Sequence, residues 1–353
     1  MRILFLATDN DRPTGGCKMI YHLVDILNEN GFEAYALHQT RNFRYTWFKN
    51  ETPVRYTYQI LQERVRSSQW KHFLRTSWIR ARNRLRHTGA RTAAVTVTKK
   101  DLIVLPATRA IWIDEILPGV PKVTLSQGPY LLLSSYQGGY GPDSTLFHPD
   151  IVGRITMSKL NYDMQSFTFP KLEFHYIPCF IDSELFSCHG KKKNQIAYMP
   201  RKGANDARAL LNMLRFRRNL QDFEIVPIDN ASQEEVARIL KESLIFLSFS
   251  HREGLGLPAA EAMACGCIVI GYTGNGGEEF FNPEYCYPIA EGDLLSYAKT
   301  VERFVNQYNT APDTLQVMGR KASAAILDQY SPLHTKRYCV EAFSALLEVL
   351  RSA

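Results

Sequence analysis

Long hydrophobic runs and paired cysteines are the two features that this sequence lacks. No stretch approaches the roughly 18 apolar residues that a membrane-spanning helix needs. The seven cysteines are an odd number and include no Cys-x-x-Cys pair, which favours reduced thiols in a cytosol over a disulfide framework. The apolar residues 1–7 are too few for a signal peptide, and Asp9 and Asp11 follow directly. We therefore expect a cytoplasmic protein.

Length and residue pattern predict two α/β domains. The chain has 353 residues, of which 45% are hydrophobic and 22% charged, as is typical of a soluble protein with a full core. Short apolar segments alternate with helical ones in both halves, which predicts doubly wound parallel sheets. We expect strands at 1–7, 32–37, 102–105, 122–125, 154–157, 174–177, 195–199, 223–227, 244–249 and 267–271. We expect helices from Gly15-Gly16 to Asn30-Gly31, and near 204–218, 257–264, 294–306, 314–328 and 335–350.

The most informative stretch is HREGLGLPAAEAMACGCIVIG, which carries two glutamates. Glu253 lies in the loop that leaves the predicted strand 244–249, and Glu261 lies on the first turns of the next helix. Ligands of open α/β sheets bind outside the carboxyl ends of the strands, so both carboxylates are expected at a binding crevice. Gly254 and Gly256 let backbone N–H groups approach a ligand beside the positive end of the helix dipole. The two carboxylates could bind the hydroxyl groups of a ribose and a hexose, and the backbone amides could bind a diphosphate between them. Such a set of groups suits a nucleotide-sugar.

This run, E-G-x-G-x-P-x-x-E-A-M-A-C-G, resembles the paired-glutamate motif of retaining glycosyltransferases of the GT-B fold, in the large family-4-like group. The resemblance implies two Rossmann-like domains that face each other across a cleft. On that plan residues 1–178 form the acceptor-side domain, residues 179–330 bind the nucleotide-sugar, and the helix 331–353 packs back on the first domain. It implies a metal-independent hexosyl- or related transferase that needs no cofactor beyond its nucleotide-diphosphate sugar donor.

The resemblance also implies roles for the residues of the motif. Glu253 would bind the hydroxyl groups of the transferred sugar, and Glu261 would bind the ribose. Further donor contacts would fall on the loop between them, at Gly254, Leu255, Gly256 and Leu257.

Arg201 and Lys202 end the stretch YMPRKG, after the first predicted strand of the second half. Two cations there would meet the diphosphate leaving group, which gains negative charge as the glycosidic bond breaks. Members of the resembled family separate this arginine and lysine by several residues, whereas here they are adjacent. A solvated basic turn is the alternative.

Gly15, Gly16 and Gln127 are the candidates of the first half. We interpret the Gly-Gly turn as a loop whose amides face the donor diphosphate and the acceptor hydroxyl, with an ordinary tight turn as the alternative. Gln127 follows the predicted strand 122–125, about where members of the resembled family often carry a histidine. An amide can hydrogen-bond but cannot exchange a proton near pH 7. It is compatible with a mechanism in which the leaving phosphate takes the acceptor proton on the same face.

Two further turns complete the list of candidates. The turn 274–279 aligns with the second glycine turn of the resembled family, so its amides and one of Glu278 or Glu279 would line the sugar pocket. We choose Gly276, Gly277 and Glu278 as candidates, with a plain loop as the alternative. The Asp9-Asn10-Asp11 triplet resembles the D-x-D metal site of the other glycosyltransferase fold, GT-A. At the end of the first strand, however, turn chemistry is favoured over cation binding. We therefore expect no metal.

Residues 61–91 form a basic arm. Nine arginines and lysines against one acid give +8, and the chain's formal charge of +7 leaves about −1 for the other residues. Trp70 and Trp78 share a helical face, between basic residues that include Arg75 and Arg82. A basic helix with tryptophans on its apolar face is typical of an anionic membrane surface. A core-packed aromatic face and a nucleic-acid groove are the alternatives.

These patterns favour an enzyme that transfers a sugar, with retention, from a nucleotide-diphosphate sugar to a glycan or lipid-linked acceptor. The arm would place it at the inner face of a membrane. One alternative is a glycosyltransferase that acts on a modified base in nucleic acid. Another is a non-catalytic protein of the same fold that binds nucleotide-sugar or polyanion. A nucleotide-sugar epimerase or a phosphorylase on this fold is less favoured.

Overall fold

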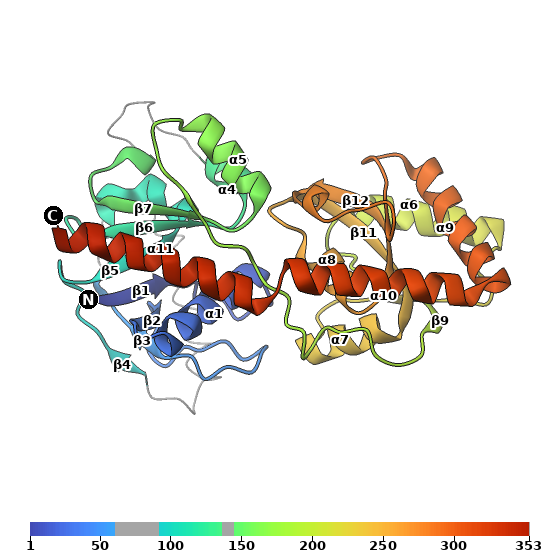
Figure 1. Ribbon diagram of the computed structural model, residues 1–353, viewed down its shortest axis with the longest axis horizontal. Coiled ribbons are helices and arrows are strands. Elements are labelled where there is room, and N and C mark those ends of the chain that lie inside the picture. The colour runs from blue at the N-terminus through green and yellow to red at the C-terminus, as the bar shows by residue number, and fades with distance from the viewer. Residues whose placement is uncertain (61–91, 136–144, 353) are drawn as a thin grey trace, which may run out of the picture. The chain divides into compact units, whose positions relative to one another are not determined.

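The computed structural model describes residues 1–60, 92–135 and 145–352. The chain divides into two compact units, each with its own parallel sheet (Figure 1). Unit 1 comprises Met1–Met157, Tyr162–Ile177 and Lys336–Ala353, and unit 2 comprises Ser158–Asn161 and Pro178–Thr335. The two parallel sheets with intervening helices that the alternating pattern predicted are confirmed.

The sheet of unit 1 is built outward from β1. Its order is β4-β3-β2-β1-β5-β6-β7-β8, and each described pairing is parallel. Strands are added first on one side of β1 and then on the other, which is the doubly wound arrangement. The strands are β1 (Arg2–Leu6), β2 (Glu33–His38), β3 (Val54–Tyr56), β4 (Ala93–Ala94), β5 (Leu102–Pro106), β6 (Lys122–Ser126), β7 (Ile151–Thr156) and β8 (His175–Tyr176).

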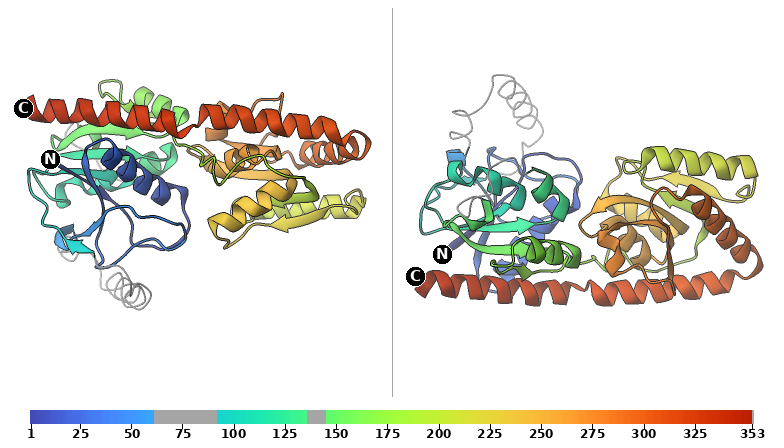
Figure 2. Two further views of the ribbon diagram at one scale, coloured as in Figure 1. Left: turned by 60° about the horizontal axis from the view of Figure 1, so that its bottom comes forward. Right: turned by 90° about the horizontal axis from the view of Figure 1, so that it is seen from above.

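Helices cover both faces of this sheet, because alternate residues of β1 point to opposite sides. Leu4 and Leu6 share one core with Ala110 and Leu132. Phe5 instead packs on Phe343, with ring centroids 5.6 Å apart, and α11 runs along that face (Figures 1 and 2). The helices are α1 (Gly15–Glu29), η1 (Ala107–Glu115), α4 (Pro129–Ser135), η2 (Thr145–Phe147), α5 (Lys159–Thr168) and α11 (Pro332–Ser352).

Unit 2 has a five-stranded parallel sheet in the order β10-β9-β11-β12-β13. Its strands are β9 (Lys193–Tyr198), β10 (Glu224–Pro227), β11 (Ser243–Glu253), β12 (Ile268–Asn275) and β13 (Cys286–Pro288). Its helices are α6 (Ala204–Arg217), α7 (Gln233–Glu242), α8 (Leu257–Ala264), η3 (Gly276–Glu279), α9 (Leu294–Thr310) and α10 (Pro312–Gln329). The buried Tyr297 of α9 ties its helix to the sheet, because its hydroxyl lies 3.0 and 2.8 Å from the carbonyl oxygens of Ser248 and Ile270.

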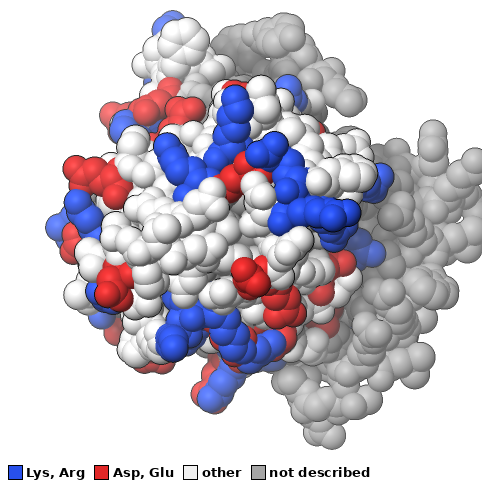
Figure 3. All heavy atoms as spheres, turned by 90° about the vertical axis from the view of Figure 1, so that its right-hand side faces the viewer, with Lys and Arg blue, Asp and Glu red and all other residues white. Residues whose placement is uncertain are grey.

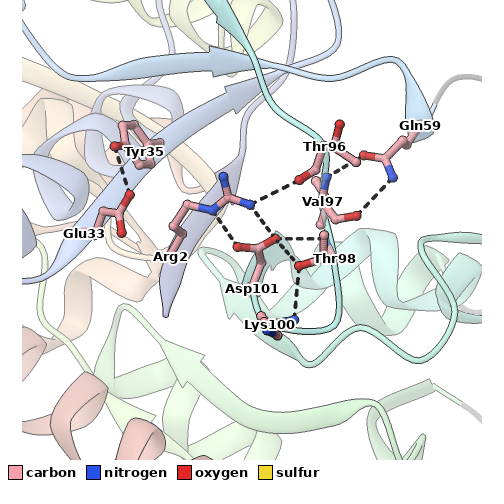
Figure 4. A network of polar contacts seen from close by, with 9 residues as sticks. All are labelled: Arg2, Glu33, Tyr35, Gln59, Thr96, Val97, Thr98, Lys100 and Asp101. Atoms are coloured by element: carbon pink, nitrogen blue, oxygen red, sulfur yellow. Dashed lines mark hydrogen bonds and ion pairs between the residues drawn. The ribbon is translucent and has the colours of Figure 1, made fainter.

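A polar network closes the amino edge of the unit 1 sheet (Figure 4). The Arg2 guanidinium donates to both carboxylate oxygens of Asp101, at 2.7 and 2.9 Å, and the Thr98 N–H donates to the same carboxylate at 2.8 Å. Burial raises the pKa of Asp101, but the hydrogen bonds from Arg2 and Thr98 outweigh it and hold that pKa below its usual value. This network lies at the amino ends of β1 and β5, whereas ligands of such sheets bind at the carboxyl ends of the strands. We therefore assign the network to stability.

Several elements were not predicted from the sequence. Strands β3, β4 and β13 have three, two and three residues, which is too few for a periodic pattern to appear. Helix α7 was also missed, although Ser232 caps it by accepting from the Glu235 N–H. In the part of the chain that the structure describes, no helix is both long and apolar enough to traverse a lipid bilayer.

Candidate functional site

Three loops of unit 2 leave the sheet at one edge. Strands β9, β11 and β12 are neighbours and parallel, so the loops that follow them start from the same side of the sheet. They contain Arg201 and Lys202 after β9, the motif from Glu253 onward after β11, and the turn from Gly276 onward after β12. Carboxyl ends of parallel strands are where open α/β sheets bind ligands.

The loops after β11 and β12 pack directly on each other. A side chain at Gly276 would place its Cβ 2.3 Å from the carbonyl oxygen of Gly254, a separation that real Cβ atoms do not show. Gly274 has φ +63° and lies so close to Glu253 that a Cβ there would be 3.1 Å from the Glu253 Cγ. The predicted second glycine turn is therefore needed to bring η3 against the backbone at Glu253.

Lys202 and Glu253 form an ion pair across the β9 and β11 loops. The lysine reaches Glu253 because Gly203 has φ +61° and its Cα packs against Phe249, where a Cβ would lie 2.8 Å from the Phe249 Cβ. Glu253 is mostly covered, with 16% of its side chain exposed, and Lys202 is half-buried. Burial and the neighbouring Arg201 charge lower the pKa of Lys202 to about 8.

Glu261 lies on α8, the helix that starts four residues after Glu253. Gly256 precedes the helix with φ +93°, and Pro258 occupies its first turn, where no intrahelical N–H is required. Five other residues of α8 are buried, whereas Glu261 is half-buried. The start of α6 follows Gly203 at the same edge, so two helix N-termini, whose N–H groups favour anions, begin beside the Lys202–Glu253 pair.

The two glutamates of η3 have different surroundings. Glu278 is exposed. Glu279 accepts a hydrogen bond of 2.9 Å from the Lys159 N–H and another from the Tyr330 hydroxyl. Lys159 and Tyr330 both belong to unit 2, so Glu279 connects η3 with two other segments of its own unit. The assignment of Glu278 to a sugar pocket stays a prediction.

In unit 1 the structure brings Gly16 and Gln127 together. The Gln127 side-chain amide donates to the Gly16 carbonyl oxygen at 2.8 Å, across 111 positions of sequence. A Cβ at Gly16 would lie 2.3 Å from the Gln127 amide oxygen, so glycine is what permits this approach. Gly15 and Gly16 open α1, and Gln127 follows β6, so both lie at the carboxyl edge of the unit 1 sheet.

The carboxylates of Asp9 and Asp11 hold the loop after β2. Asp9 contacts the His38 Nδ1 at 2.8 Å and accepts from the Gln39 N–H. Asp11 accepts from the backbone and the hydroxyl of Thr46, at 2.9 and 2.5 Å. These contacts correspond to the turn chemistry expected of the triplet. Among the described residues, no three His, Cys, Asp or Glu side chains are grouped so that they could hold a metal ion.

The basic arm, with Trp70, Arg75, Trp78 and Arg82, lies outside the described residues. Figure 3 shows a face of unit 2 on which basic and acidic side chains are interleaved. Within unit 2, basic and acidic side chains form ion pairs such as Arg217–Glu302 and Lys193–Glu242.

Sequence reasoning missed three features of the site. It did not predict the Lys202–Glu253 pair, the contacts of Glu279 with Lys159 and Tyr330, or the left-handed backbone of Arg252, which has φ +48°. The first two depend on packing between loops distant in sequence. The sequence gives no indication of the left-handed backbone of Arg252, because arginine is uncommon in that conformation.

Comparison with known proteins supports the fold. Residues 224–323 match the family model described as glycosyl transferases group 1. An alpha-1,6-glucosyltransferase of Actinobacillus pleuropneumoniae serotype 7 (strain AP76) is 38% identical over 88 residues, which are 24% of this chain and 26% of that protein's own length. The matched stretch thus spans about a quarter of this curated relative.

Solved structures are similar over the whole chain. The sucrose-phosphate synthase of Thermosynechococcus elongatus has a TM-score of 0.65 at 12% identity, covering 100% of both chains. HepE of Anabaena, in complex with UDP and glucose, has a TM-score of 0.63 at 13% identity, covering 98% of this chain and 100% of that one. With its two parallel-sheet units, the chain therefore has the two-domain, Rossmann-like GT-B fold that the motif implied.

Proposed function

We propose that the protein is a retaining, metal-independent glycosyltransferase, which moves a sugar from a nucleotide-diphosphate sugar to a glycan or lipid-linked acceptor. The observation that carries the proposal is the Lys202–Glu253 ion pair, which places a cation and an acid side by side at the carboxyl edge of the unit 2 sheet. The matched region 224–323 includes Glu253 and Glu261. The description of the matched family, glycosyl transferases group 1, and the name of the relative, an alpha-1,6-glucosyltransferase, support the same activity.

The donor-binding residues of unit 2 divide by chemistry. Arg201 and Lys202 neutralise the diphosphate together with the N–H groups at the start of α6. Glu261 accepts hydrogen bonds from the ribose hydroxyls, and Glu253 from those of the transferred sugar. The loop Gly254–Leu257 adds backbone N–H groups, and Gly276, Gly277 and Glu278 form one wall of the sugar pocket.

The reaction exchanges one bond of the anomeric carbon for another on the same face. The bond to the diphosphate oxygen breaks, and the electron pair leaves with the phosphate. The bond to the acceptor oxygen forms, and its proton passes to the departing phosphate oxygen. The cations stabilise the negative charge that develops on the leaving group, which is where a fixed charge accelerates such a step. Gly16 and Gln127 of unit 1 serve the acceptor side, Gln127 by hydrogen bonding alone.

The test is an NMR assay of nucleotide-sugar turnover in the presence of EDTA. Release of nucleoside diphosphate, with a product that keeps the anomeric configuration of the donor, is expected. Inverted configuration would overturn retention, and loss of activity on chelation with recovery on added manganese would overturn metal independence. Nucleotide binding without any turnover, over a broad acceptor panel, would favour the non-catalytic alternative.

A further inference from the structure

Arg252 lies in an irregularity at the end of β11. Ser250 pairs with Thr273, and the next pair joins Glu253 to Asn275, so β11 advances three residues while β12 advances two. The extra residue makes a β-bulge, a feature that changes the direction of the side chains that follow it. Arg252 has φ +48° within this bulge, directly before Glu253.

An arginine is an unfavourable residue for this backbone. The left-handed conformation is strained for residues with a Cβ, and glycine adopts it freely. The same site uses glycine at three other left-handed positions, Gly203, Gly256 and Gly274. Backbone strain of this kind is concentrated at functional sites. We therefore expect the Arg252 side chain to have a function that glycine could not provide.

The charge of Arg252 is not compensated by its neighbours in sequence. On one side His251 contacts Glu291 at 2.5 Å, and on the other Glu253 is paired with Lys202. Arg252 itself is exposed, and within residues 1–60, 92–135 and 145–352 it has no hydrogen-bond or ion-pair partner. Arg201, directly before Lys202, is also exposed, and its guanidinium has no hydrogen-bond or ion-pair partner in the described part of the chain. Two such guanidinium groups, one from each loop, therefore flank the ion pair.

We propose that Arg252 is a further substrate-binding residue of this site, which takes a phosphate or carboxylate oxyanion of a substrate. The proposal rests on the proposed function. A guanidinium suits this task because its planar fork binds two oxygens of such a group at once, which a lysine cannot do. The oxyanion belongs either to the donor diphosphate or to an anionic acceptor, and binding measurements distinguish these sources.

The test compares the wild-type protein with Arg252→Gly, Arg252→Lys and the control Arg218→Gly. Arg218 is also an exposed, left-handed arginine of unit 2, with φ +58°, but it ends α6 away from the three loops. Both glycine variants remove one charge and relieve one strained position. Calorimetry would measure the affinity of each protein for UDP, GDP, ADP and inorganic pyrophosphate, and for glucose 6-phosphate against glucose.

Arg252→Gly should melt no lower than the wild type and yet bind at least one of these anions about tenfold more weakly, because a charge-assisted bidentate contact is lost. Weaker binding of nucleotide and pyrophosphate would assign the oxyanion to the donor, and weaker binding of glucose 6-phosphate alone would assign it to the acceptor. Arg252→Lys should recover part of the loss, and Arg218→Gly should bind as the wild type does.

Two negative results have different meanings. In the first, the wild type binds nucleotide, and the affinities of Arg252→Gly for nucleotide and for glucose 6-phosphate stay within twofold of the wild-type values. This result would overturn the role of Arg252 alone. A wild-type protein that binds none of the nucleotides would overturn the proposed function and this proposal with it.

Discussion

Lys202 and Glu253 are paired with each other in this structure, although we assign them to different parts of a donor. Lys202 would bind the diphosphate, and Glu253 would bind the transferred sugar. Donor binding must therefore exchange the partners of both side chains. The ion pair places two opposite charges beside each other until the diphosphate arrives, at some cost to the affinity for nucleotide.

The first prediction concerns the charge of Glu253. Glu253→Gln removes the competitor for Lys202, so a nucleoside diphosphate without sugar should bind about two- to fivefold more tightly, as expected for a partly exposed ion pair. Transfer of the sugar should be slowed at the same time, because Glu253 no longer accepts from its hydroxyls. Calorimetry and a turnover assay measure the two effects, with the exposed Glu234→Gln as the charge-matched control. Weaker nucleotide binding in Glu253→Gln would contradict the exchange of partners.

The second prediction follows from the lowered pKa of Lys202, about 8. A diphosphate favours the charged ammonium, so binding should take up a proton wherever free Lys202 is neutral. Affinity should be full below pH 8 and should fall as the pH rises above 8, approaching tenfold per pH unit. Lys202→Arg should bind nucleotide with little dependence on pH in this range, since arginine stays charged. An equal decline in both proteins would show that another group is responsible.

The third prediction concerns Glu261. Glu261→Ala should weaken the binding of nucleoside diphosphate by about tenfold or more, because hydrogen bonds to a carboxylate contribute ~1.5–3 kcal/mol. Inorganic pyrophosphate, which has no ribose, is the control ligand. Its affinity should be the same in Glu261→Ala and wild type. A parallel loss of pyrophosphate affinity would place Glu261 away from the ribose.

The fourth prediction concerns the amino edge of unit 1. Asp101→Asn should lower the free energy of unfolding by about 1.5–3 kcal/mol, since the charged hydrogen bonds with Arg2 are lost. The pKa of Asp101 is lowered in the folded protein, so its contribution is present above the unfolded pKa and is lost as the pH falls through the folded value. Denaturant unfolding at pH 7 and pH 3 measures both. A difference between variant and wild type that is as large at pH 3 would contradict this origin.

Much of this molecule could be predicted from its sequence, because the motif around Glu253 fixes a strand, a glycine loop and a helix in order. The parallel sheets followed from alternating apolar segments, and the GT-B fold from the motif. The contacts of the site could not be predicted. The Lys202–Glu253 pair depends on how Gly203 packs on Phe249, and the choice between Glu278 and Glu279 depends on Tyr330, which is distant in sequence.

Calorimetric titration with nucleoside diphosphates in the presence of EDTA tests whether the loops of unit 2 that contain Lys202 and Glu261 bind the donor. We expect that at least one of UDP, GDP and ADP binds the wild-type protein without metal, and that the double variant Lys202→Ala, Glu261→Ala loses that binding while remaining folded. Absence of binding by the wild type, or equal binding by the double variant, would contradict the assignment of the donor site to these loops of unit 2.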